Sequence, residues 1–64
     1  SSGPIFAGPR LFVTGSNGTL IQLDPATGNY LTQTRLGAGV SLPPIVANST
    51  LYVYDDDAKL HAFR

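Results

Sequence analysis

The residues that could do chemistry lie near the end of the chain, where Asp55, Asp56 and Asp57 form its only cluster of charge. Several carboxylate oxygens close together suit Ca²⁺. A calcium-binding loop would add further spaced ligands and a Glu, and the chain contains no Glu. We therefore expect the three aspartates to form a solvated hairpin tip, and we assign no metal site to them.

His61 is the only histidine. A zinc site needs further His, Cys or acidic ligands, and Cys is absent as well as Glu. Nothing in the sequence places a serine and an aspartate beside His61, so no nucleophilic triad can be assigned. His61 shares a strand face with Lys59 and Phe63, and we expect it to pack between two sheets. The sequence predicts no catalytic, cofactor-binding or metal-binding residues.

The other candidate motifs are better explained as turns and linkers. Gly37-Ala38-Gly39 is too short to cradle a phosphate, and no Lys-Ser or Lys-Thr pair follows it. Residues 17–19 and 48–50 match the glycosylation triplet, but both fall in expected turns. Three tyrosines could line a binding groove; we expect Tyr52 to be a core residue, and Tyr30 and Tyr54 stay open.

Composition excludes several classes of protein. Of the 64 residues, 42% are hydrophobic and 12% charged, and the four basic and four acidic side chains cancel. The chain is therefore neither a disordered charged tail nor a typical nucleic-acid binder. No apolar run approaches the roughly 20 residues of a membrane span. Seven Gly and five Pro, with one Lys and no Met, favour strands and turns over helices.

An internal repeat with an offset of 40 residues organises the chain. It pairs six identical residues between positions 4 and 24 and their counterparts, among them Leu11 with Leu51 and Val13 with Val53. The apolar runs predict strands near residues 4–7, 10–15, 19–24 and 30–36 in the first unit. The second unit predicts strands near 44–47, 50–55 and 59–63.

A period near 40 with four short strands per unit is typical of a β-propeller blade. We expect an all-β fold with a flexible leader at 1–3, a four-stranded blade at 4–42 and a second blade at 43–64 that lacks its outer strand. Such a chain is about one and three-quarter blades of a larger ring. A domain this small buries only about 60% of its unfolded surface, so the isolated chain is expected to self-associate.

The stretch from Leu11 to Gly28 resembles the repeat of quinoprotein-like (PQQ-type) propellers. Asn17-Gly18 stands at that family's Asp-Gly, and Asp24 with Thr27-Gly28 stands at its Asp-Ala-x-Thr-Gly. Thr32 replaces the docking Trp of the family, and Asp57-Ala58 replaces the second Asp-Gly. The ending from Val46 to Arg64 is most similar to the C-terminal part of the BamB family of outer-membrane assembly lipoproteins.

The resemblance implies a non-enzymatic scaffold that binds other subunits of the β-barrel assembly machine, with no cofactor and no nucleic acid or small-molecule substrate. Its implied location is the periplasmic side of the bacterial outer membrane. Two alternatives stay open: a fragment of a PQQ-dependent dehydrogenase, against which the missing Trp argues, and a module that completes a ring by self-assembly.

Overall fold

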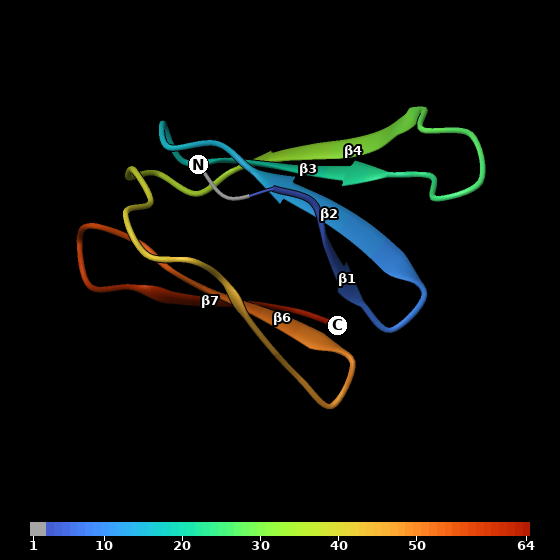
Figure 1. The fold of residues 1–64 in the computed structure, drawn as a ribbon. Coiled ribbons are helices and arrows are strands. Elements are labelled where there is room, and N and C mark those ends of the chain that lie inside the picture. Colours follow the sequence, from blue (N-terminus) through green and yellow to red (C-terminus); the bar gives the residue numbers. More distant parts are fainter. Residues whose placement is uncertain (1–2) are drawn as a thin grey trace.

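The computed structural model describes residues 3–64, which form two antiparallel sheets (Figure 1). The expected leader at 1–3 lies largely outside the described residues. No helix long and apolar enough to cross a membrane occurs in residues 3–64. The all-β prediction is confirmed.

Seven strands make up the sheets in residues 3–64, and each lies within one residue of its predicted bounds. The first sheet has the order β1-β2-β3-β4 and the second the order β5-β6-β7. Their bounds are β1 Ile5–Ala7, β2 Arg10–Thr14, β3 Thr19–Leu23, β4 Tyr30–Arg35, β5 Ile45–Ala47, β6 Thr50–Tyr54 and β7 Leu60–Phe63.

The repeat holds at the level of strand register. Ile5 pairs with Phe12 in the first sheet, as Ile45 pairs with Tyr52 in the second. Val13 pairs with Ile21 between β2 and β3, and Val53 pairs with His61 between β6 and β7. Because every pair shifts by the same 40 residues, equivalent residues occupy equivalent faces of the two sheets.

The β3–β4 turn is held by Asp24. Its carbonyl accepts the Gly28 N–H at 2.7 Å, and its side-chain Oδ1 accepts the Ala26 N–H at 2.8 Å. Asp24 also donates its own N–H to the Asn29 carbonyl. Gly28 adopts a φ of 78°, which favours glycine. These bonds explain why Asp24 and Gly28 suit this turn.

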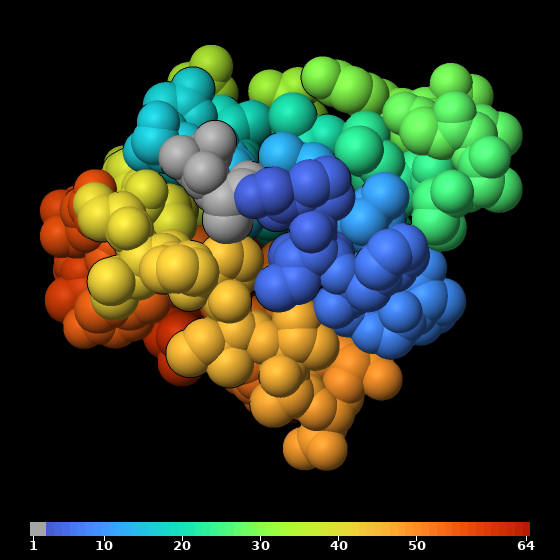
Figure 2. Space-filling view, in the orientation of Figure 1, coloured from blue at the N-terminus to red at the C-terminus, as the bar shows by residue number. Residues whose placement is uncertain are grey.

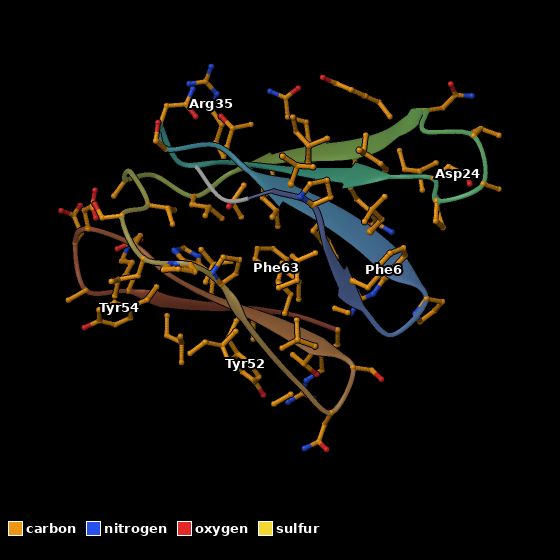
Figure 3. All side chains as sticks on the ribbon, viewed as in Figure 1. Phe6, Asp24, Arg35, Tyr52, Tyr54 and Phe63 are labelled. Carbon is orange, nitrogen blue, oxygen red and sulfur yellow. The ribbon has the colours of Figure 1, made fainter. Side chains whose placement is uncertain are left out.

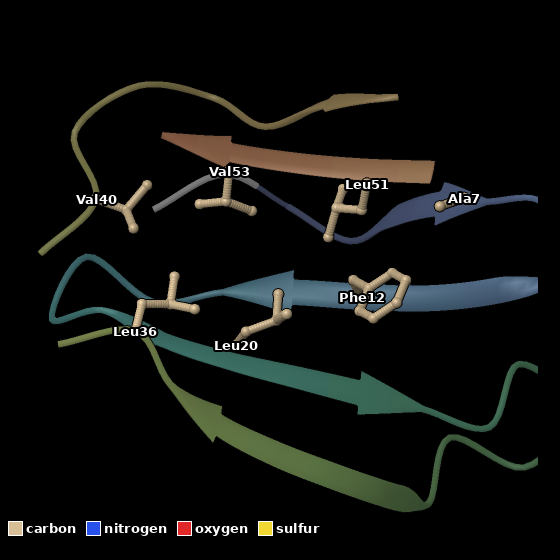
Figure 4. Packing of buried hydrophobic residues seen from close by; sticks show 7 residues of the cluster. All are labelled: Ala7, Phe12, Leu20, Leu36, Val40, Leu51 and Val53. Carbon is tan, nitrogen blue, oxygen red and sulfur yellow. The ribbon is translucent and has the colours of Figure 1, made fainter. Parts of the chain in front are cut away.

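The core lies between the two sheets (Figure 4). Phe12 and Leu20 come from the first sheet and meet Leu51 and Val53 from the second. The Phe12 and Phe63 rings also approach across the gap, with 6.4 Å between their centroids. Full burial of an aliphatic side chain such as Leu51 contributes about 1.5–3 kcal/mol. The segment after β4 adds Leu36 and Val40 to this cluster.

Residues 36–41, the first part of the segment that joins the sheets, run between the two hairpin tips. The Leu36 N–H donates to Gly18 O, and the Val40 N–H donates to Ser16 O. Gly39 O accepts the Asp56 N–H at 2.8 Å from the other side. At the same time the inner strands β1 and β5 lie in contact (Figure 2). The two sheets are therefore joined at several points along their length.

Candidate functional site

Asp55 directly follows β6 and is buried, with 3% of its surface exposed. The expectation of a solvated tip is wrong for this residue, although Asp56 and Asp57 are exposed. Its Oδ1 accepts the backbone N–H groups of Asp57 and Lys59, both at 2.9 Å. The carboxylate lies at the interface side of the second sheet, where it closes the β6–β7 hairpin. An acidic side chain can be buried there because its acceptors are satisfied.

His61 pairs with Asp55 across the same hairpin. Its Nε2 lies 2.7 Å from Asp55 Oδ2. An ionised carboxylate can only accept, so Nε2 carries the hydrogen and donates it. The His61 hydrogen bond and the Lys59 N–H hold the pKa of Asp55 below its ordinary value of 3.8, although burial opposes them.

The geometry of this pair accounts for a structural role. His61 lies on the face that carries Val53 and Phe63, toward the first sheet, as the sequence predicted. Asp56 is engaged elsewhere, because its Oδ1 accepts the Ser41 hydroxyl at 2.7 Å. Within residues 3–64 no three His, Cys, Asp or Glu side chains gather into a possible metal site. The Asp55–His61 pair therefore ties the residue after β6 to β7, while Asp56 makes the contacts with the linker.

The contact between Asp55 and His61 was not predicted from the sequence. The signal was available in the repeat. If β6 and β7 pair with the register of β2 and β3, Val53 lies opposite His61, and Asp55 follows Val53 by two residues on the same face. A diagonal Asp–His contact could have been predicted from that register.

The other candidates lie apart from this pair. Tyr30 and Tyr54 are exposed, and Tyr52 is half-buried on the side of the second sheet away from the first (Figure 3). The expectation that Tyr52 is a core residue is wrong, because no described strand covers the face that carries it. A hollow of about 230 Å³ adjoins the β2–β3 tip and is lined by Asn17, Gly18, Thr19, Arg35 and Gly37. Arg35 is its only charged lining residue.

The second sheet has an open edge at β7. In the first sheet β3 pairs with β2 on one side and with β4 on the other. Within the part of the chain that the structure describes, β7 pairs with β6 alone. Its outer backbone groups are therefore free of strand partners.

The sequence that forms these two stacked sheets matches the model of a known protein family over its whole length. The family model described as outer membrane protein assembly factor BamB covers residues 1–64. The chain belongs to the BamB family. A search of curated proteins finds no match.

The BamB-family match confirms the resemblance to PQQ-type repeats that the sequence carries between Leu11 and Gly28. It supports a propeller-type module, and the two stacked sheets agree with partial blades. In this BamB-family chain the Asp24 turn forms as the repeat motif requires, while Thr32 lies exposed on β4 where the motif has Trp.

Proposed function

We propose that this chain is part of a non-enzymatic propeller scaffold that binds protein partners in outer-membrane β-barrel assembly. The proposal places it on the periplasmic side of the bacterial outer membrane. The family match over residues 1–64 supports the assembly role. The backbone of β7 supports the mode of binding.

The unpaired edge of β7 is the observation that carries this proposal. The Asp55 N–H donates to Lys59 O, which makes these two residues a hydrogen-bonded pair of the hairpin. Hydrogen-bonded and non-hydrogen-bonded pairs alternate along antiparallel strands. The N–H groups of Leu60 and Ala62 therefore point away from β6, toward the open edge. An extended segment of a partner can accept them by strand addition.

The first sheet indicates what kind of segment fits. The residues equivalent to Leu60 and Ala62 are Leu20 and Gln22, which pair with Thr34 and Thr32 of β4. That strand is antiparallel, six residues long and exposed at every position. A partner at the β7 edge would therefore supply a short, antiparallel, largely polar strand, held mainly by its backbone.

A proline scan of the edges tests the proposal. Ala62→Pro removes one outward N–H from β7 without removing a bond to β6, and edge strands tolerate such prolines. Gln33→Pro is the matched control, since by the same alternation its N–H points to the outer edge of β4. Binding to purified subunits of a β-barrel assembly machine is measured by biolayer interferometry, after circular dichroism has shown that both variants keep their sheets.

We expect Ala62→Pro to weaken binding about tenfold, the combined effect of a lost hydrogen bond and a disturbed edge. Gln33→Pro should bind like the parent chain. Absence of binding by the unmodified chain, or equal effects of the two prolines, would count against the proposal.

A further inference from the structure

Each sheet has one face that packs against the other sheet and one open face, which no strand in residues 3–64 covers. The open face of the first sheet, here called the front face, carries Leu11, Val13, Ile21 and Leu23, which are strand partners of one another. The open face of the second sheet, here called the back face, carries Ile45, Tyr52, Tyr54, Leu60 and Ala62. Figure 3 shows Tyr52 and Tyr54 on the side of the second sheet away from the first.

The two open faces are the repeat equivalents of the two faces that already meet inside the chain. The front-face residues Leu11, Val13 and Leu23 correspond to Leu51, Val53 and Phe63, which face the first sheet. The back-face residues Tyr52 and Leu60 correspond to Phe12 and Leu20, which face the second sheet. The chain therefore carries both halves of a contact that it has already formed once.

The back face is also the chief apolar patch of the second sheet. Ile45 is 67% exposed, Leu60 64% and Tyr54 47%. None of the five back-face residues and none of the four front-face residues carries a charge, and the one charged residue of β3 and β4 on the side of the front face is Arg35 at the end of β4. Large exposed apolar patches of this kind mark contact surfaces.

We propose that the back face of one copy of this chain stacks on the front face of a second copy, head to tail. The contact repeats the internal packing of the two sheets, with Tyr52 and Leu60 in the places of Phe12 and Leu20. It uses sheet faces and leaves the β7 edge free, so it is independent of the strand-addition proposal. The occupant is a second copy because the chain itself provides both complementary faces.

Substitutions between the two units make the contact between copies more apolar than the internal one. Gly15 and Ile21 stand where the second unit has Asp55 and His61, so the buried acid–imidazole pair is replaced by small and apolar groups. Tyr54 takes the place that Thr14 has in the internal contact, and it adds an aromatic ring. Gly15 takes the place of Asp55 and leaves room beside that ring.

The contact between copies lacks one hydrogen bond that the internal contact has. Arg10, which donates to Phe63 O inside the chain, is replaced by Thr50. The contact between copies therefore relies on apolar burial, and we expect it to strengthen with salts that favour burial, such as sulfate.

A head-to-tail contact joins two different faces, and this gives a sharp test. Leu60→Asp blocks the back face only, and Ile21→Asp blocks the front face only. Thr32→Asp is the control, because Thr32 is exposed on β4 and lies on the same side of the first sheet as Gln22, opposite to Ile21. Mass is measured by light scattering after size-exclusion chromatography, up to about 1 mM chain, where even weak association is visible.

We expect the parent chain and Thr32→Asp to form species larger than a monomer. Leu60→Asp and Ile21→Asp should each associate at least about 30-fold more weakly and elute as monomers. An equimolar mixture of these two should form a dimer and nothing larger, since each variant retains the face that the other lacks.

Three results would overturn the proposal: a monomeric parent chain at the highest concentration, a dimer of Ile21→Asp alone, or no dimer in the mixture. A dimer of Ile21→Asp would mean that back faces pair with each other. If either Asp variant loses its sheet signal in circular dichroism, Tyr54→Ser and Val13→Ser replace Leu60→Asp and Ile21→Asp in the same mixture experiment.

Discussion

Asp55 is a buried carboxylate in a chain that has few charges. It organises the end of β6 through three acceptor contacts, with the N–H groups of Asp57 and Lys59 and with the ring of His61. All three favour the ionised form, which is why the pKa of Asp55 lies below its ordinary value. Protonation of this group would remove an acceptor from donors that are already partly shielded from water.

This arrangement predicts a pH-dependent stability. Because the pKa of Asp55 is lower in the folded chain, the unfolded chain binds more protons at acidic pH, and stability falls as pH decreases. The contribution is complete well above 3.8 and is lost as pH falls below that value toward the folded pKa. Urea unfolding of the parent chain and Asp55→Asn, from about pH 6 to pH 2, should show a smaller acid loss for the variant.

Asp57→Asn is the control for that titration. Asp57 belongs to the same turn but is exposed, so its variant should keep the acid dependence of the parent chain. At neutral pH Asp55→Asn should unfold at lower urea than Asp57→Asn, because an amide oxygen accepts these bonds more weakly than a carboxylate. Identical pH slopes for the parent chain and Asp55→Asn would contradict the argument.

The sequence could group the three aspartates, but it could not distinguish Asp55 from its neighbours. Local composition suggested a solvated turn for all of them, and this is correct for Asp56 and Asp57 only. The acceptor atoms of Asp55 are satisfied by the Asp57 and Lys59 N–H groups and by His61, which the β6–β7 hairpin brings to it. Such contacts are visible in a sequence only after the strand register has been inferred.

At the scale of elements, the strands could be predicted from the sequence because the residues that determine strands and turns are local. Runs of β-branched and aromatic residues between Gly, Pro and Asn turns predict strands with little help from tertiary packing. The 40-residue repeat added the register, since equivalent strands pair equivalently. What it left open is which face of each sheet is covered, and this explains why Tyr52 was expected in the core.

The two equivalent hairpin tips each have one residue with a left-handed backbone, and the residue type at that position differs. Gly18 has a φ of 87° in the first unit, while Ala58 has a φ of 63° in the second. A side chain costs about 1–2 kcal/mol in this region, so the β6–β7 turn is strained at Ala58. Each residue donates its N–H to the residue three positions earlier, Gly15 or Asp55, so the turns are otherwise alike.

We predict that Ala58→Gly stabilises the chain by about 0.5–1 kcal/mol, because relief of the strain exceeds the added flexibility of the unfolded chain. Thermal unfolding should show a midpoint several degrees higher. Gly18→Ala is the matched opposite change and should destabilise by more than this, since its Cβ would also collide with Ala38 O. A lower midpoint for Ala58→Gly would mean that the turn is not strained.

At the scale of the whole molecule, Arg10 connects the two sheets. It begins β2, and its Nη2 donates to Phe63 O of β7 at 2.9 Å and to Ser49 O, in the turn between β5 and β6, at 3.2 Å. Its guanidinium also lies 5.2 Å from the centre of the Phe12 ring, where a cation is favourable. No sequence pattern predicts this role of Arg10, because Phe63 is 53 residues away and the second repeat unit has Thr50 at the equivalent position.

Arg10→Ala should therefore loosen the second sheet more than the first. Hydrogen bonds to charged groups contribute about 1.5–3 kcal/mol, and a loss in this range should lower the free energy of unfolding measured in urea. Hydrogen exchange locates the effect, with β6 and β7 amides losing more protection than β3 amides, because the three-stranded sheet depends on its neighbour for cover.

Arg35→Ala is the control, because it removes an exposed arginine from β4 and should change neither measurement. Arg10→Lys keeps the charge but not the planar fork, so it should fall between Arg10→Ala and the parent chain. Equal exchange in β3 and β7 after Arg10→Ala would show that the two sheets unfold as one unit without a separate contribution from this arginine.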